Sequence, residues 1–123
     1  MEKVYISGKI SNLENGIARG RFAVAEEILH QHGYCTYNPT RNWLSRCHWL
    51  YRLVGYTLTL LYDLWQLSRC QRIYLIPGWE SSRGACIESF FAFKMKVRRI
   101  PLTEREEIDK EFHKLLIKKE KKS

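Results

Sequence analysis

Four short runs of strand-forming residues alternate along this chain with longer segments of helical periodicity, and this alternation constrains the fold more than any other feature. β-Branched and aromatic residues favour strands, whereas apolar residues spaced three and four apart indicate helices. Short strands that alternate with helices predict βαβ units, in which a parallel sheet carries helices on both faces. The expected strands span residues 3–7, 34–37, 72–76 and 98–100, and the expected helices span residues 19–32, 57–68, 84–96 and 103 onward.

The helix ends carry signals of their own. Gly33 follows the first expected helix and is a natural C-terminal stop. Thr103 and Glu106 have the spacing of a capping box that would open the last helix. We expect an α/β domain over residues 1–102, followed by an amphipathic helix with a basic tail over residues 103–123. The positions expected to face the core are Phe22, Ala25, Ile28 and Leu29 on the first helix, Leu60, Leu61, Leu64 and Leu67 on the second, and Ile108, Phe112, Leu115 and Leu116 on the last.

Polar segments follow three of the expected strands. They are Gly8-Lys9, Asn38-Pro39 and the loop from Gly78 to Gly84. In a parallel α/β sheet, ligands bind beyond the carboxyl ends of the strands. We therefore expect these segments to converge on one crevice.

The loop Ser81-Ser82-Arg83-Gly84 ends where a helix is expected to begin. Free backbone N–H groups at a helix N-terminus, with hydroxyls and a guanidinium nearby, suit a phosphate group. The alternative is that Ser81 or Ser82 only caps the helix, and the two roles are compatible. The Walker pattern G-x-x-x-x-G-K-[ST] is absent, which argues against an ordinary nucleoside triphosphatase.

Glu88 lies one turn after Gly84 in a segment whose later residues include Phe90, Phe91 and Phe93, so we expect a buried helix that contains a carboxylate. An isolated buried charge is costly, and the helix N-terminus would favour its ionised form. Such a carboxylate is a candidate nucleophile or base.

Asp63, on the preceding helix, supplies a second carboxylate. A nucleophilic carboxylate beside a second acid is the arrangement that cleaves glycosidic bonds. For Asp63, a solvated helix face or a salt bridge to Arg72 is the alternative.

The formal net charge of +8 favours anionic partners, but four of the last six residues are lysines in an expected loose tail. The other basic residues are dispersed and no nucleic-acid-binding motif occurs, which argues against a nucleic-acid partner. Four cysteines without a C-x-x-C pair and four histidines without ligand spacing argue against a metal site, and we expect no cofactor. No signal peptide and no membrane-spanning run are recognised, so we expect a cytoplasmic protein with no membrane partner.

Four motifs together resemble the nucleoside 2-deoxyribosyltransferase-like family, and in particular a small subgroup with bacterial and phage members. They run in the family's order from about Tyr5 to Ile100. The resemblance implies a flavodoxin-like three-layer sandwich and a kinship with deoxynucleoside 5′-monophosphate N-glycosidases. The motifs are YISGKI (residues 5–10), YNP (37–39), DLWQLSRC (63–70) and IYLIPGWESSRGACIE (73–88).

The resemblance also implies roles for individual residues. Glu88 matches the nucleophile that attacks C1′ of the deoxyribose, because it stands four residues after Gly84. Asp63 matches the acid that binds the sugar hydroxyl or assists the departing base, and Tyr5 matches a tyrosine that orients the nucleophile. Ser82 and Gly84 match positions that hold a 5′-phosphate, with Gly8 and Lys9 on the other side of the crevice.

Two departures from the family pattern are Lys9, where the subgroup usually has proline, and Gln71, where an acidic residue often follows the cysteine. Residues 42–56 match nothing in the family, so the base is not specified. Trp43 and Trp79 are candidates to stack on it, although an aromatic core residue is the commoner fate.

The leading hypothesis is an enzyme that cleaves the N-glycosidic bond of a 2′-deoxynucleotide or related nucleotide, with Ser81, Arg83 and the rest of the loop holding the phosphate. The alternative is a module that binds a nucleotide, or a signal derived from one, without turnover. Family members are commonly homo-oligomers, and the aromatic-rich residues 43–62 are a candidate interface.

Overall fold

In the part of the chain that the structure describes, the sheet has four parallel strands, as the alternation of elements predicts. A computed structural model describes residues 2–9, 15–41 and 61–121 of the chain. The strand order is β2-β1-β3-β4, which is the order of the first four strands in the flavodoxin-like fold. Tyr5 of β1 is paired with Tyr37 of β2, and Ser7 with Leu75 of β3, so the carboxyl ends of these strands share one edge. The strands are β1 (Lys3–Ser7), β2 (Cys35–Tyr37), β3 (Arg72–Leu75) and β4 (Arg98–Arg99).

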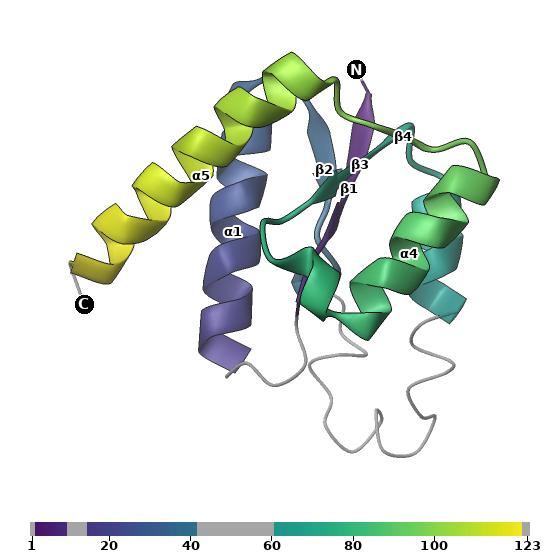
Figure 1. The fold of residues 1–123 in the computed structure, drawn as a ribbon, viewed down its shortest axis with the longest axis horizontal. Helices are drawn as coiled ribbons and strands as arrows, with labels where there is room; N and C mark the ends of the chain where they lie inside the picture. Colours follow the sequence, from purple (N-terminus) through teal and green to yellow (C-terminus); the bar gives the residue numbers. More distant parts are fainter. Residues whose placement is uncertain (1, 10–14, 42–60, 122–123) are drawn as a thin grey trace.

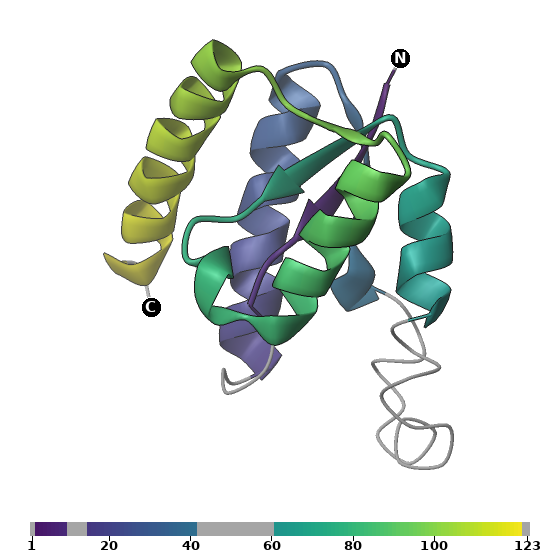
Figure 2. The ribbon, with the colours of Figure 1, turned by 45° about the vertical axis from the view of Figure 1, so that its right-hand side comes forward.

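Helices cover both faces of the sheet, which gives the predicted three-layer α/β sandwich. In Figures 1 and 2, α1 and α5 lie on one face, while α4 and the helix over residues 61–68 lie on the other. The other α-helices of the described residues are α1 (Asn15–Gln31), α4 (Arg83–Lys94) and α5 (Leu102–Lys121), and the short 3-10 helices there are η1 (Pro39–Arg41) and η2 (Trp79–Ser81).

The core between the sheet and the α1/α5 layer uses alternate residues of each strand. Val4 and Ile6 of β1 point to this side, because successive side chains of a strand alternate between faces. The predicted face of α1 is confirmed, since Phe22, Ala25, Ile28 and Leu29 are all buried. The predicted face of α5 meets the same core: Ile108 and Phe112 are fully buried and Leu115 and Leu116 are partly buried.

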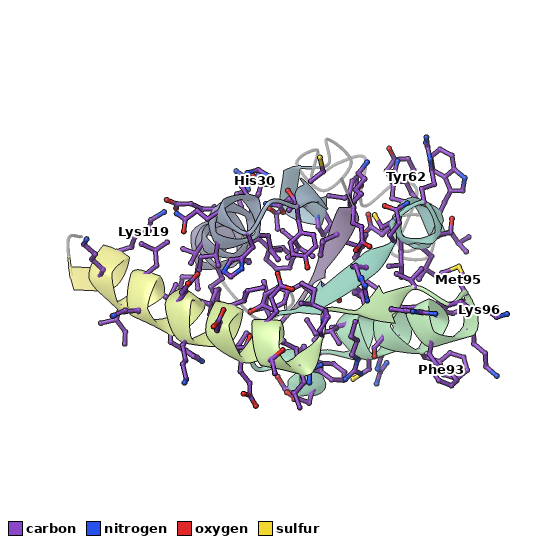
Figure 3. All side chains as sticks on the ribbon, turned by 90° about the horizontal axis from the view of Figure 1, so that it is seen from above. His30, Tyr62, Phe93, Met95, Lys96 and Lys119 are labelled. Atoms are coloured by element: carbon purple, nitrogen blue, oxygen red, sulfur yellow. The ribbon has the colours of Figure 1, made fainter. Side chains whose placement is uncertain are left out.

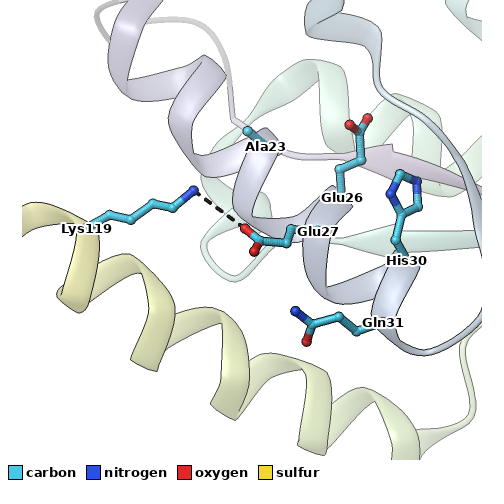
Figure 4. Close-up of a pocket in the computed structure, with 6 residues that line it drawn as sticks. All are labelled: Ala23, Glu26, Glu27, His30, Gln31 and Lys119. Carbon is cyan, nitrogen blue, oxygen red and sulfur yellow. Dashed lines mark ion pairs between the residues drawn. The ribbon is translucent and has the colours of Figure 1, made fainter.

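Ion pairs at the surface join α1 and α5 beside this core. Lys119 lies 3.6 Å from Glu27 across the hollow shown in Figure 4. Directly after the C-terminal end of α1, His32 lies 3.1 Å from Glu111 and 3.6 Å from Glu104. The C-terminal helix is therefore packed against the α/β domain rather than extending from it.

The core on the opposite face contains the residues that position the candidate site. Tyr5, Ile73 and Leu75 of the sheet pack here against Leu64 and Leu67 of the helix over residues 61–68. Leu61, predicted to share that buried face, is instead 55 % exposed, and Leu60 lies outside the described residues. Leu61 and Leu64 are three residues apart, so the buried stripe is narrower than the sequence pattern suggests.

The prediction that α4 is buried is wrong. Only Ala85, Glu88 and Ala92 of α4 are buried, at a spacing of three and four residues that forms one stripe. Phe90, Phe91 and Phe93 fall outside this stripe and are exposed, and Figure 3 shows Phe93 pointing away from the sheet. The helix thus covers the sheet with small side chains and carries its large aromatic residues on the outside.

The helix ends confirm one prediction and contradict another. Gly33 stops α1 in the left-handed conformation, and the N–H groups of Gly33 and Tyr34 donate to carbonyls of the last turn. By contrast, α5 begins at Leu102, so Thr103 lies inside the helix and cannot be its N-cap. The Pro101 carbonyl accepts from the Arg105 N–H, and the helix begins two residues earlier than a capping box with Thr103 as the N-cap predicts. Of the described helices, none is both long and apolar enough to cross a membrane.

Candidate functional site

Glu88 lies on the inner stripe of α4 and reaches two hydroxyl groups of β1. The Tyr5 hydroxyl donates to Oε2 of Glu88, and the Ser7 hydroxyl donates to Oε1 at 2.8 Å. Tyr5 and Ser7 are two residues apart on one strand, so their side chains point to the same face. Glu88 is 8 % exposed, and both hydroxyl-bearing residues are fully buried. The buried carboxylate therefore has a donor for each oxygen.

Asp63 and Tyr37 complete the surroundings of Glu88. The negative charge of Asp63 is close enough to raise the pKa values of Glu88, Tyr5 and Tyr37. The Tyr37 ring stacks on the Tyr5 ring, with centroids 5.4 Å apart and planes 18° apart. Arg72, the alternative partner considered for Asp63, forms its ion pair with Glu2 at 2.8 Å. The structure thus brings Glu88, Asp63 and Tyr5 together, as the sequence motifs predict.

The two members of the Tyr5–Glu88 hydrogen bond have displaced pKa values. The pKa of Glu88 is raised from 4.5 to about 7, mainly because of burial; the hydrogen bonds from Tyr5 and Ser7 oppose this rise, and the charge of Asp63 adds to it. Burial, followed by the charges of Glu88 and Asp63, raises the pKa of Tyr5 well above 10, so Tyr5 keeps its proton and stays a donor. The expectation that the helix N-terminus holds Glu88 ionised does not explain why the pKa of Glu88 is raised. Glu88 lies five residues into α4, and the dipole effect fades within the first turn.

Ser7 is the site residue that the sequence analysis missed. A serine followed by glycine is typical of a turn, so Ser7 was interpreted only as the end of the strand. The signal that could have found it is the two-residue spacing from Tyr5. Once Tyr5 was assigned to the sheet face that meets the nucleophile, Ser7 had to share that face.

Gly8 and Lys9 follow β1 at the same edge of the sheet. A Cβ atom on Gly8 would lie 3.0 Å from the Cβ of Ile76, so close packing against the residue after β3 is sufficient reason for glycine here. Lys9 is half-buried. Asn38, at the end of β2, is buried and accepts from both the N–H and the hydroxyl of Thr40.

The loop from Gly78 to Gly84 leads from β3 to the first turn of α4. Gly78 has a φ of 95°, a conformation that favours glycine, and the side chain of Arg21 donates to the preceding Pro77 carbonyl at 2.7 Å. Ser82 is the N-cap of α4, and its hydroxyl accepts from the Ala85 N–H at 3.2 Å. The Ser81 hydroxyl donates to the Gly78 carbonyl at 3.0 Å. Capping is therefore an actual role of Ser82.

Arg83 and Gly84 form the first turn of α4. Their N–H groups have no acceptor among the described residues, and Arg83 is exposed. This end of α4 thus offers two amide donors and a guanidinium to an anion.

Trp79 lies in η2, between β3 and α4. It is half-buried against the core, and the guanidinium of Arg99 lies 5.3 Å from its ring centroid. It borders a separate hollow that also contains Arg105 and Asp109. These contacts give Trp79 a packing role, its stacking on a base stays a prediction, and Trp43 lies outside the described residues. Within the described ranges, no cluster of histidine, cysteine and acidic residues could hold a metal ion.

Comparison with known protein families gives one match. Residues 2–100 match the family described as Domain of unknown function (DUF4406). No curated protein and no solved structure matches the chain. Because the match covers well over half of the sequence, the chain belongs to the DUF4406 family.

Proposed function

We propose that this DUF4406 protein cleaves the N-glycosidic bond of a 2′-deoxynucleotide or a related nucleotide, with Glu88 as the nucleophile. The observation that carries the proposal is the buried Glu88 carboxylate, which accepts one hydrogen bond from Tyr5 and one from Ser7 at the carboxyl edge of the sheet. A nucleophile that forms a covalent intermediate has to be held in one orientation in a dry site. The resemblance of the motifs to nucleoside 2-deoxyribosyltransferase-like proteins supports the same reaction.

The proposed reaction has two steps. In the first, a carboxylate oxygen of Glu88 bonds to C1′ of the sugar while the bond from C1′ to the base nitrogen breaks, and the base leaves with a proton from Asp63 or solvent. In the second, water attacks C1′, the ester bond to Glu88 breaks, and the water proton passes to Asp63 or solvent. Two displacements at C1′ retain its configuration. A second base in place of water would make the reaction a transfer.

The hydroxyls of Tyr5 and Ser7 have a defined task in this scheme. Each donates to Glu88 and stabilises its ionised form against the effect of burial. With its pKa raised to about 7, Glu88 is available in the ionised form that a nucleophile requires near neutral pH. Positive charge that develops on the sugar in an oxocarbenium-like transition state would favour the ionised form further.

The N-terminus of α4 is the proposed site for a 5′-phosphate. Arg83 and Glu88 are five residues apart on one helix, a rise of about 7 Å. A sugar with its C1′ at Glu88 would therefore place a 5′-phosphate near the amide groups of Arg83 and Gly84. Arg83→Ala is expected to weaken the use of a monophosphate without affecting the corresponding nucleoside.

The test is the release of free base from a panel of 2′-deoxynucleoside monophosphates and nucleosides, followed by chromatography. We expect release by the native protein, none by Glu88→Gln, and impaired release by Ser7→Ala. Ser68→Ala is a matched control, because the Ser68 hydroxyl is exposed and donates only to the Trp65 carbonyl. Equal release by the native protein and Glu88→Gln would refute the assignment of the nucleophile.

The second candidate is a module that binds a nucleotide without turnover, and the pKa of Glu88 favours it. Because the pKa of Glu88 is raised to about 7, its protonated form is also available near neutral pH and could donate a hydrogen bond to a ligand. Stoichiometric binding of a nucleotide by calorimetry, with no base released from any member of the panel, would support this candidate over the enzyme.

A further inference from the structure

A groove of about 620 Å³ runs between α4 and β4, on the edge of the sheet and apart from the residues that surround Glu88. Its floor is formed by the buried side chains of Ala92 and Val97. Phe90 and Phe93 of α4 border it, and they are 57 % and 79 % exposed. Figure 3 shows Phe93 projecting outward from α4. The groove thus combines a buried apolar floor with two aromatic side chains that are each more than half exposed.

The charged residues of the groove are all basic. They are Lys96, Arg98 and Arg99, and no acidic residue lines it. Arg99 is oriented by a neutral partner, since its guanidinium donates to the Ser89 hydroxyl at 3.0 Å. Among the described residues, no carboxylate forms an ion pair with any of these three side chains. The positive charge along the groove is therefore not neutralised within this part of the chain.

Lys96 occupies a backbone position that glycine would adopt more easily. Its φ is 61°, and the N–H groups of Lys96 and Val97 donate to the carbonyls of Phe93 and Ala92 at the end of α4. Gly33 closes α1 with the same pair of bonds. A lysine in the left-handed conformation is destabilising relative to glycine, and such residues gather where a side chain has a use. Here the strained residue adds its charge to the groove.

We propose that the groove between α4 and β4 is a docking site for an acidic segment of a partner protein that carries large apolar side chains. The apolar side chains would fill the space over Ala92 and Val97 between Phe90 and Phe93. The carboxylates would pair with Lys96, Arg98 and Arg99. Aromatic anchors at the centre and charge complementarity at the rim are the features that give such interfaces affinity and specificity. This proposal does not depend on the reaction proposed for Glu88.

The same observations disfavour other occupants. A second copy of the chain, related by a two-fold axis through α4, would set the basic residues of one groove against those of the other. Single-stranded nucleic acid is bound by successive bases stacking on several aromatic faces, but Lys94 lies over the Phe90 ring at 5.5 Å, so that of the two aromatic residues of the groove Phe93 alone offers an open face. A lipid surface favours a convex apolar face, whereas this site is concave.

The test uses the full-length protein and a fluorescein-labelled peptide in which glutamates alternate with leucine and phenylalanine, followed by fluorescence anisotropy. We expect saturable binding that Phe93→Ala weakens by roughly tenfold or more, the effect of losing a central aromatic anchor. Arg98→Glu is expected to weaken binding to a similar extent. Ile17→Ala and Lys114→Glu, which remove an exposed apolar residue and an exposed lysine elsewhere, should leave it unchanged.

Lys96→Gly separates docking from folding. This variant should unfold at a higher urea concentration than the native protein and yet bind the peptide more weakly. The proposal is overturned if the peptide fails to bind, or if a peptide with glutamines in place of the glutamates binds equally well. The proposal is also overturned if the groove serves another occupant. In that case Phe93→Ala would abolish binding to single-stranded DNA, binding to anionic vesicles or self-association, while binding of the peptide would persist.

Discussion

Removing the Tyr5 hydroxyl is the sharpest perturbation of the candidate site. In Tyr5→Phe, Oε2 of Glu88 loses its donor while the ring and its stacking on Tyr37 remain. A hydrogen bond to a charged group contributes about 1.5–3 kcal/mol, and a shift of one pKa unit corresponds to about 1.4 kcal/mol. The hydrogen bond favours the ionised form, so its loss should raise the midpoint of the Glu88 titration, about 7 in the native protein, by roughly one to two pH units.

The titration can be followed by NMR of protein labelled with ¹³C at the glutamate side-chain carboxyl groups. The resonance of Glu88 is the one that disappears in Glu88→Gln. Tyr34→Phe is the matched control, because the Tyr34 hydroxyl donates to Glu104 at 2.9 Å, away from the site. We expect the control to leave the Glu88 midpoint in place. A midpoint in Tyr5→Phe that stays the same or falls would refute the claim that this hydroxyl stabilises the ionised carboxylate.

Three further predictions concern stability. The folded-state pKa of Glu88 is raised from 4.5 to about 7, so the contribution of its protonation to the free energy of unfolding is fully present below pH 4.5 and is lost as the pH rises to 7. Urea unfolding at a series of pH values should therefore show a loss of about 3 kcal/mol over this range, and the loss should be absent in Glu88→Gln. Lys96→Gly should raise the free energy of unfolding by about 0.5–1 kcal/mol, whereas Gly33→Ala should lower it by about 1–2 kcal/mol, and similar signs for both would contradict the left-handed closure of the two helices. Ser82→Ala should lower the thermal midpoint through the loss of about 1 kcal/mol of capping, and a comparable loss in Ser81→Ala, whose exposed hydroxyl meets only a loop carbonyl, would count against that assignment.

The architecture of the sheet could be predicted because each of its strands and helix ends is specified by a few neighbouring residues. Runs such as Val4-Tyr5-Ile6 specify strands by residue type, and Gly33 specifies a helix end by its backbone freedom. Parallel pairing then follows from the helices between the strands. The prediction that a capping box at Thr103 opens α5 was wrong because Pro101 also suits the position before the first turn of a helix. The side-chain pattern does not reveal which of the two residues precedes the helix.

The burial of α4 could not be predicted from its composition. The segment contains enough aromatic residues to suggest a buried helix, but which residues face the sheet depends on how closely the helix approaches it. Ala85 and Ala92 allow a close approach, which leaves room for Glu88 between them and turns Phe93 outward. The same packing gives Glu88 its burial and therefore its raised pKa.

The residues of the candidate site were predicted unevenly for a related reason. Glu88, Asp63 and Tyr5 were found through motifs, whereas Ser7 required knowledge of which strand face meets Glu88. The loop makes Trp79 a candidate for the site, and the structure adds that its ring packs on the core beside Arg99. The direction of a side chain depends on the tertiary packing around it and cannot be inferred from its position in a loop.

The central claim, that Glu88 forms a bond to the sugar, is tested most directly by mass spectrometry of the protein quenched in acid during turnover of a 2′-deoxynucleoside monophosphate. The account predicts a mass increase equal to the sugar phosphate residue, located by proteolysis on the peptide that contains Glu88 and absent in Glu88→Gln. Base release without any such adduct, or an adduct on another residue, would contradict it.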